Sequence, residues 1–275
     1  MDIAFHAPAA PLDAHVETFF HYRGWQPDHS VERVVPSGHV FLIFELDGIE
    51  RHTCDNDTLA PNGFFRRSWV SGMLRQYITI SAHADSEMFV IQFRAAGARP
   101  FLHLPLDGFS ERVVPGEEVL DGELLAARDR LIWAEGREAK FAAAEEWLAA
   151  RYRQDLAPPG PVLEVVERLA AEPGARYADA IAGYPGSRKH LISEFRRYLG
   201  VTPKYYQRIL RFNDVLRVIQ AEGPVAWSAV AHHCGYSDQS HFIRDFRYFS
   251  GFNPTDFLRR GFDAQTNFFP LDRRG

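Results

Sequence analysis

Apolar and polar residues alternate in short runs through the first 115 residues of the chain. β-Branched and aromatic residues dominate these runs, and Gly, Pro, Asn and Asp separate them, which is typical of strands. We predict strands at Val31–Val35, Gly38–Leu46, Arg67–Val70, Gln76–Ile80 and Met88–Phe93. Several short strands at this spacing predict a small antiparallel barrel or sandwich. Before them, Pro11–Tyr22 predicts a short leading helix with Val16, Phe19 and Phe20 as its apolar positions.

After Pro115 the spacing of apolar residues becomes helical. Glu123–Glu135 and Ala139–Arg153 repeat their apolar positions with a helical period and are rich in Ala, Leu, Glu and Arg, so both segments predict helices. Pro158-Pro159-Gly160-Pro161 follows, and a proline-rich segment of this kind predicts a semi-rigid linker.

The remaining part contains one amphipathic pattern twice, 51 residues apart. His190–Pro203 and His241–Pro254 align without a gap, and an internal repeat fixes the unit of architecture. In each copy three apolar residues fall on one inward helical face; they are Leu191, Phe195 and Tyr198, then Phe242, Phe246 and Phe249. Gly200 and Gly251 stand where a helix ends with a positive φ, and a proline follows three residues later.

A short helix and a tight turn precede the second copy. Trp227–His233 predicts the helix, Cys234–Ser237 the turn, and Ser237 or Asp238 the cap of the next helix. The first copy has the same order in Tyr177–Ala182, Gly183–Gly186 and Ser187. A short helix, a turn with glycine and a longer basic helix make a helix-turn-helix. The fold class is therefore α+β, with an N-terminal small antiparallel β domain with helices and a C-terminal all-α double helix-turn-helix domain.

The helical part resembles the AraC family of bacterial transcription regulators. The residues that carry the resemblance are Ala229–Ala231, Gly235–Phe242, Phe246-Arg247 and Gly251–Pro254, with Tyr206–Ile219 similar to the family's linking helix. The resemblance covers about residues 160–262. The first copy departs from the family pattern, because the Leu-Ala pair of its leading helix is weak and Pro185-Gly186 occupy the turn.

The N-terminal half resembles the domain of unknown function that precedes the DNA-binding part in one AraC subgroup. The matching segments are Phe19–Tyr22, Arg33–Val40, Gly72, Phe93-Arg94, Gly97, Phe101 and Glu111–Pro115. The resemblance implies a regulator architecture and names no ligand. We divide the chain into a sensor or association domain (residues 1–155), a linker (156–161), a DNA-binding domain (162–262) and a C-terminal tail (263–275).

The resemblance and the outward helix faces together assign residues that bind double-stranded DNA. An apolar Ile on a polar, basic face suits the major groove, which offers thymine methyls, base-edge acceptors and phosphates. The predicted base-reading residues are Lys189, Ile192, Ser193, Gln239, Ser240, His241, Ile243 and Arg244. The predicted phosphate contacts are Ser187, Arg188, Arg196 and Arg247. A small-molecule effector, RNA polymerase and a second copy of the chain are further candidate partners.

The distribution of charge agrees with this division. From Pro158 onward there are 16 Lys and Arg against 12 Asp and Glu, a net of +4, while the preceding residues have 15 against 24, a net of −9. Such asymmetry indicates a basic nucleic-acid module joined to an acidic module. No apolar run approaches the roughly 18 residues of a membrane span, and we expect no signal peptide. Only Cys54 and Cys234 are present, which favours the reducing cytoplasm.

Other classes of function remain open at this point. Cys54 is a candidate for alkyl transfer in a DNA-localised repair enzyme, although no base is reliably placed beside it. Alternatively, the first half is an interaction module without a ligand. Neither His52-x-Cys54-Asp55 nor His232-His233-Cys234 has zinc-ligand spacing, and we expect no catalytic residue, metal or cofactor. The aromatic residues of the first half predict either plain core or an apolar pocket; they are Trp25, Phe41, Phe44, Trp69, Tyr77, Phe89 and Phe93.

Overall fold

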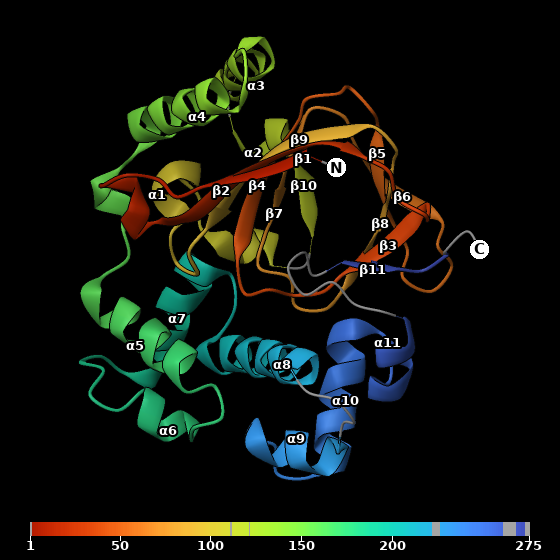
Figure 1. Ribbon diagram of the computed structural model, residues 1–275. Helices are drawn as coiled ribbons and strands as arrows, with labels where there is room; N and C mark the ends of the chain where they lie inside the picture. The colour runs from red at the N-terminus through yellow and green to blue at the C-terminus, as the bar shows by residue number, and fades with distance from the viewer. Residues whose placement is uncertain (1, 111, 121, 222–225, 261–267, 273–275) are drawn as a thin grey trace.

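The computed structural model describes residues 2–110, 112–120, 122–221, 226–260 and 268–272. Two sheets and a pair of helices make the N-terminal half, and a layer of further helices lies beneath them (Figure 1). Glu111, which belongs to one of the matching segments above, lies outside the described residues, as do residues 263–267 and 273–275 of the predicted tail.

The strands form two antiparallel sheets. The six-stranded sheet has the order β1-β2-β9-β4-β7-β10, and the five-stranded sheet has the order β11-β3-β8-β5-β6. Every neighbouring pair is antiparallel, which confirms the predicted class of the N-terminal domain. The strands are β1 Asp2–His6, β2 Val16–Trp25, β3 Val31–Val34, β4 Val40–Glu45, β5 Arg51–Cys54, β6 Pro61–Phe65, β7 Ser68–Ser71, β8 Ile78–Ser81, β9 Ser86–Phe93, β10 Val113–Pro115 and β11 Phe268–Pro270.

The prediction of a leading helix at Pro11–Tyr22 is wrong. Only Leu12–Ala14 forms a single helical turn, η1, and β2 begins at Val16. A register shift between Val16 and Thr18 turns both Val16 and Phe19 inward, where each is fully buried. A bulge adds one residue to a strand, so two inward side chains three positions apart imitate the spacing of a helix. Beyond the bulge, burial alternates along β2 as in an ordinary strand.

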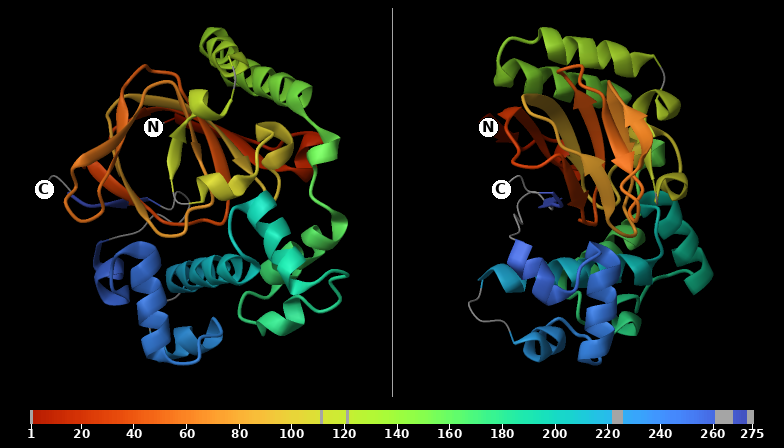
Figure 2. Two further views of the ribbon diagram at one scale, coloured as in Figure 1. Left: turned by 180° about the vertical axis from the view of Figure 1, so that it is seen from behind. Right: turned by 90° about the vertical axis from the view of Figure 1, so that its right-hand side faces the viewer.

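The helices largely follow the predicted periodicity. They are α1 Arg99–Leu102, η2 Leu106–Phe109, α2 Gly116–Val119, α3 Glu123–Trp133, α4 Arg137–Arg151, η3 Gln154–Leu156, α5 Gly160–Ala171, α6 Tyr177–Ala180, α7 Arg188–Leu199, α8 Pro203–Ala221, α9 Trp227–His233, α10 Gln239–Ser250 and α11 Pro254–Arg260. The helices α3 and α4 cover the outer face of the six-stranded sheet, and α5 to α11 form the all-α part (Figure 2).

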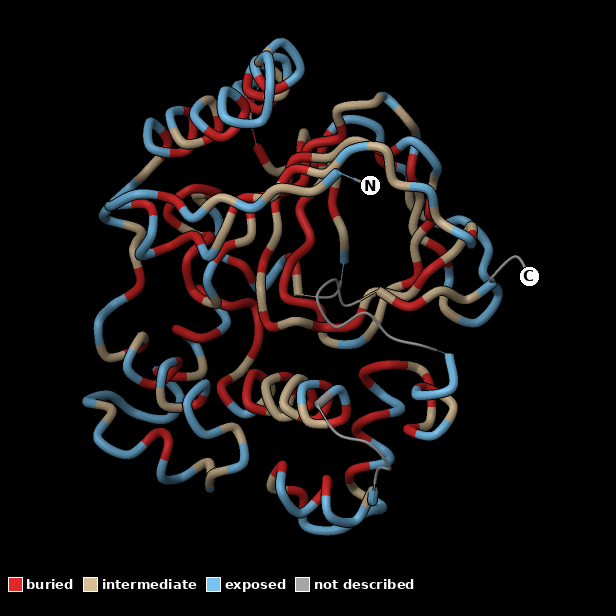
Figure 3. The backbone as a smooth tube through the Cα atoms, viewed as in Figure 1, coloured by how far each residue is buried: buried red, intermediate tan, exposed pale blue. Residues whose placement is uncertain are grey.

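Part of the aromatic content of the first half is plain core. Phe44 and Phe89 point from the six-stranded sheet toward α4, with ring centroids 5.7 Å from Trp147 and 5.7 Å from Phe141, respectively. Phe93 packs in the same way on Phe101 of α1. These residues belong to one hydrophobic core, and buried positions recur along the strands and helices of this half (Figure 3). The other four aromatic residues, Trp25, Phe41, Trp69 and Tyr77, are half-buried.

After the helical part, the strand β11 adds to the edge of the five-stranded sheet. It pairs with β3, so that Phe268 lies opposite Val34 and Pro270 opposite Glu32. The Asp272 carboxylate accepts hydrogen bonds from the backbone N–H groups of Ser30, at 3.0 Å, and Val31, at 2.9 Å. The pattern of apolar positions did not predict this strand, which is only three residues long.

Candidate nucleic-acid interface

The second repeat forms a complete helix-turn-helix from α9, the turn Cys234–Ser237 and α10. Asp238 caps α10, because its carboxylate accepts a hydrogen bond of 2.7 Å from the backbone N–H of His241. This bond, followed by one from the Ser237 hydroxyl, holds the pKa of Asp238 below its usual value. Gly235 makes the turn with a φ of +73°, and a Cβ there would lie 2.6 Å from Gly174. Only glycine combines this backbone angle with so close an approach.

The inward face of α10 is an aromatic core. Phe242, Phe246 and Phe249 are fully buried, which confirms the predicted inward face. The ring of Phe246 packs against Phe257 of α11 at 4.8 Å and Phe212 of α8 at 5.5 Å. Burying such rings supplies most of the stability of a small helical unit. The position of α10 is therefore fixed by packing on both α8 and α11.

The first repeat forms an equivalent long helix, α7, behind a shorter leading helix. We call α7 and α10 the reading helices. The Ser187 hydroxyl caps α7 by accepting a hydrogen bond of 3.1 Å from the backbone N–H of His190. Leu191, Phe195 and Tyr198 are buried as predicted, and Gly200 ends the helix with a φ of +82°. The leading helix α6 has only four residues, and a small cavity of about 160 Å³ separates it from α7.

The predicted DNA-binding residues gather on the outward faces of α7 and α10. The base-reading candidates Lys189, Ser193, Gln239, Ser240, Ile243 and Arg244 are exposed, whereas Ile192 and His241 are half-buried. The phosphate candidates Ser187, Arg188, Arg196 and Arg247 are all exposed. His241 is also held locally, because its Nδ1 lies 3.2 Å from the Ser237 hydroxyl and its ring packs on Tyr236. The roles of all twelve residues toward DNA stay predictions.

Asp245, the acidic neighbour of Arg244, forms an ion pair with an arginine of another helix. It is buried on α10, and the Arg208 guanidinium of α8 donates to it at 2.8 Å. Among the residues that the structure describes, no ion pair joins Asp245 to Arg244 or Arg247. Both arginines therefore remain exposed on the surface of α10.

Both reading helices point their C-terminal ends at the first domain. A Cβ at Gly200 would lie 2.7 Å from the carbonyl oxygen of Leu106, and one at Gly251 would lie 2.7 Å from the ring of Tyr77. Their N-terminal ends, which carry the base-reading candidates, are directed away from the sheets (Figure 1). The first domain therefore leaves the candidate surface uncovered.

Several residues that the sequence did not single out join the two halves. The Tyr205 hydroxyl donates to the carbonyl oxygen of Arg75 at 2.7 Å, and Asn213 donates to that of Pro36 at 3.0 Å. The Arg33 guanidinium lies between two rings, 4.3 Å from the centroids of Tyr77 and Phe252. Arg33 and Pro36 belong to the segment Arg33–Val40 of the resemblance, and Asn213 and Phe252 belong to Tyr206–Ile219 and Gly251–Pro254, but none of these segments indicated a contact between the two halves.

The chemistry around Cys54 is not that of a nucleophile. Its thiol is buried, and burial raises its pKa above the usual value. Reactive cysteines instead have a lowered pKa, since the thiolate is the attacking species. Within the described ranges, no three His, Cys, Asp or Glu side chains gather closely enough to hold a metal ion. None of the described helices has both the length and the apolar character needed to cross a membrane.

Comparisons with known proteins match both halves of the chain. A family model described as a domain of unknown function (DUF6597) matches residues 4–115, and one described as a helix-turn-helix domain matches residues 185–260. A comparison with curated proteins finds no significant match.

Solved structures of ToxT from Vibrio cholerae are similar over most of their length. One crystal form at 1.65 Å resolution has 11% identity and a TM-score of 0.46, covering 88% of this chain and 98% of that chain. The structure of ToxT bound to an unsaturated fatty acid has 12% identity and a TM-score of 0.46, covering 87% and 94%.

The two domain matches agree with the duplicated helix-turn-helix. The order of the domains is that of the subgroup whose sequence motifs appear in both halves. The chain therefore has an AraC-type helix-turn-helix domain, with a domain of unknown function preceding it.

Proposed function

We propose that residues 162–262 bind duplex DNA site-specifically, with α7 and α10 in successive major grooves. The observation that carries the proposal is the common direction of two capped helices. Each buries an apolar face and presents polar, basic N-terminal turns away from the first domain. Two reading helices of one chain then cover a non-palindromic site, because the two units are similar but not identical. Residues 1–155 take the sensing or association role, in a cytoplasmic protein whose two cysteines are free and buried.

Selection of DNA sequences by the purified full-length protein, followed by footprinting on the selected site, tests this function. Successive major grooves on one face of the duplex are about 34 Å apart, so one chain should protect roughly 20 base pairs. Protection of a single groove would mean that only one unit reads DNA. The absence of any sequence enrichment would contradict site-specific binding.

A screen of small metabolites addresses the first domain separately. A ligand should raise the unfolding temperature of the full-length protein, because a molecule that binds only the folded state stabilises it by mass action. If no metabolite has this effect while a protein partner binds residues 1–155, the first domain is an interaction module.

A further inference from the structure

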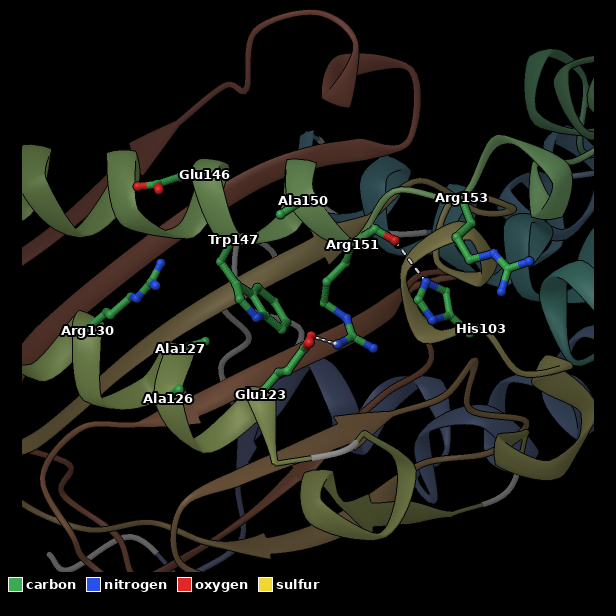
Figure 4. A pocket seen from close by; sticks show the side chains of 10 residues that line it. All are labelled: His103, Glu123, Ala126, Ala127, Arg130, Glu146, Trp147, Ala150, Arg151 and Arg153. Atoms are coloured by element: carbon green, nitrogen blue, oxygen red, sulfur yellow. Dashed lines mark hydrogen bonds and ion pairs between the residues drawn. The ribbon is translucent and has the colours of Figure 1, made fainter.

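A cleft of about 610 Å³ lies between α3 and α4 and is closed at one end by the loop after α1. Figure 4 shows its lining, with Trp147 and Arg151 projecting from α4 and Arg130 and Glu123 from α3. The volume is in the range of small-molecule sites, about 300–1,000 Å³. This cleft lies on the outer side of the six-stranded sheet, far along the chain from the predicted DNA-binding residues.

Most charges around the cleft are already paired. Arg151 is buried and donates to Glu123 at 2.7 Å, and Arg153 pairs with Asp155 at 2.8 Å. Arg130 has no ion-pair partner within the described part of the chain, and its guanidinium points from α3 toward the space beside Trp147 (Figure 4). A planar guanidinium matches the two oxygens of a carboxylate, to which it can donate two parallel hydrogen bonds.

Trp147 provides a second unsatisfied donor. Its side chain is buried, and its Nε1–H has no hydrogen-bond acceptor among the described residues. A buried donor without an acceptor is unfavourable in free energy, and a ligand that supplies the acceptor would remove this cost. The alanines that line the cleft leave room beside the indole ring; they are Ala126, Ala127 and Ala150. A flat apolar group fits this space beside the Trp147 side chain.

We propose that this cleft binds a small aromatic carboxylate. Arg130 holds the carboxylate, the Trp147 N–H donates to it, and the aromatic ring lies against the indole and the alanines. The proposal gives a position and a ligand class to the sensing role proposed above, and rests on that role only for its biological meaning.

The position of the cleft connects it to the first reading helix. At its closed end, His103 Nε2 lies 2.8 Å from the carbonyl oxygen of Arg151, and the backbone N–H of Arg153 donates to the carbonyl oxygen of Pro100 at 3.0 Å. Pro100 adjoins Arg99, whose guanidinium lies 5.1 Å from the ring centroid of Tyr198 on α7. A short chain of contacts therefore joins the cleft to the helix predicted to read DNA.

The indole N–H resonances of ¹⁵N-labelled full-length protein test the proposal, with benzoate as the probe. Five tryptophans give five such signals, and Trp147→Phe identifies the one that belongs to the cleft. Benzoate should shift the Trp147 signal saturably and leave that of Trp133, which is 82% exposed on the same hairpin, unchanged. Benzyl alcohol and benzylamine should bind at least about tenfold more weakly, because a hydrogen bond to a charged group is the stronger interaction.

Arg130→Gln is the decisive variant, since an exposed arginine can be replaced without disturbing the fold. It should weaken benzoate binding about tenfold, whereas Arg137→Gln, at the start of α4 and outside the cleft lining, should leave binding unchanged. Equal affinity of wild type and Arg130→Gln, equal binding of benzylamine, or no shift of the Trp147 signal would each overturn the proposal. A footprint recorded on the same sample without benzoate reports DNA binding independently, so a failure of the cleft is distinguishable from a failure of the proposed function.

Discussion

The two helix-turn-helix units share one sequence pattern but are supported differently. In the second unit, α9 has seven residues, and α10 is tied to α8 by the ion pair between Asp245 and Arg208. In the first unit, α6 has four residues, and a cavity lies between it and α7. Glu194, the counterpart of Asp245, pairs at 3.2 Å with Arg197 of its own helix. Among the described residues, the second unit therefore has an interhelical ion pair at the position where the first has a pair within its own helix.

This difference shows what the repeated segment specifies. Both copies produce a helix of 12 residues with a side-chain cap at the start and a left-handed glycine at the end. The glycine lies within the copy and the capping residue three residues before the start of the copy, so both features depend on local sequence and survive the divergence between copies. The leading helix lies outside the repeated segment, and it is the part that differs. Docking of a reading helix thus varies independently of the helix itself.

Replacing the central phenylalanine of each unit should give the largest difference in unfolding free energy between the two units. Phe246→Ala should destabilise the protein by about 3–5 kcal/mol, since truncating a buried ring removes its transfer free energy and leaves a cavity. Phe195→Ala should cost less, because Phe195 has a ring contact only with Tyr206, at 6.4 Å, among the described residues. Denaturant unfolding monitored by circular dichroism measures both. Ile243→Ala, on the exposed face, is the control, and an equal loss for both phenylalanines would contradict the comparison.

Replacing the buried acidic residue of each unit should give the next largest difference in unfolding free energy. Asp245→Asn should cost about 2 kcal/mol, below the 3–5 kcal/mol typical of a fully buried pair, because Arg208 is partly exposed. Glu194→Gln should cost about 0.5 kcal/mol, because Arg197 lies on the surface of the same helix. Urea unfolding of the two variants at one pH makes the measurement. A larger loss for Glu194→Gln would show that the in-helix pair is the important one.

Arg244 and its counterpart Ser193 test base reading. Arg244→Ala should weaken binding to the selected site by about 1–3 kcal/mol and relax preference at one base pair, since Arg recognises guanine through its O6 and N7 atoms. Non-specific affinity should change little. Ser193→Ala should cost less than about 1 kcal/mol, since a hydroxyl makes a weaker contact. Selected sites of the variants are compared with those of the wild type. If Arg244→Ala weakens every sequence equally, Arg244 contacts the backbone.

The smallest effect concerns phosphate contacts by Arg196 and Arg247. Replacing either with Ala should weaken binding to all sequences alike and flatten the dependence of log affinity on log salt by about one unit. Fluorescence anisotropy over a series of salt concentrations measures the slope. A change for Arg247→Ala alone would mean that only the second unit is docked on DNA, and no change for either would remove both from the backbone.

Local chemistry explains why so much of the candidate site could be predicted from the sequence. The caps Ser187 and Asp238, and the terminal glycines Gly200 and Gly251, act within a few residues, so a sequence pattern predicts them. The same reasoning gave a wrong prediction for β2, because the one extra residue of its bulge converts an alternating pattern into an apparent helical one. Spacing alone does not distinguish the two.

Contacts between distant segments could not be predicted in this way. The packing of Arg33 between Tyr77 and Phe252 joins three segments that are distant along the chain. The cleft beside Trp147 likewise depends on how α3 and α4 are held apart, which their periodicity does not specify. Such features follow from tertiary packing, and a single sequence contains no local signal for them.

The pairing of β11 with β3 determines how late in synthesis one edge of the five-stranded sheet is covered. The edge of β3 that accepts β11 is synthesised more than 200 residues before its partner. At about 5–20 residues per second, that edge stays open on the ribosome for on the order of 10–50 seconds. An unpaired edge invites association with other chains. Residues 268–272 thus protect a sheet that begins to form long before they are translated, and a chain released before Phe268 would retain the exposed edge.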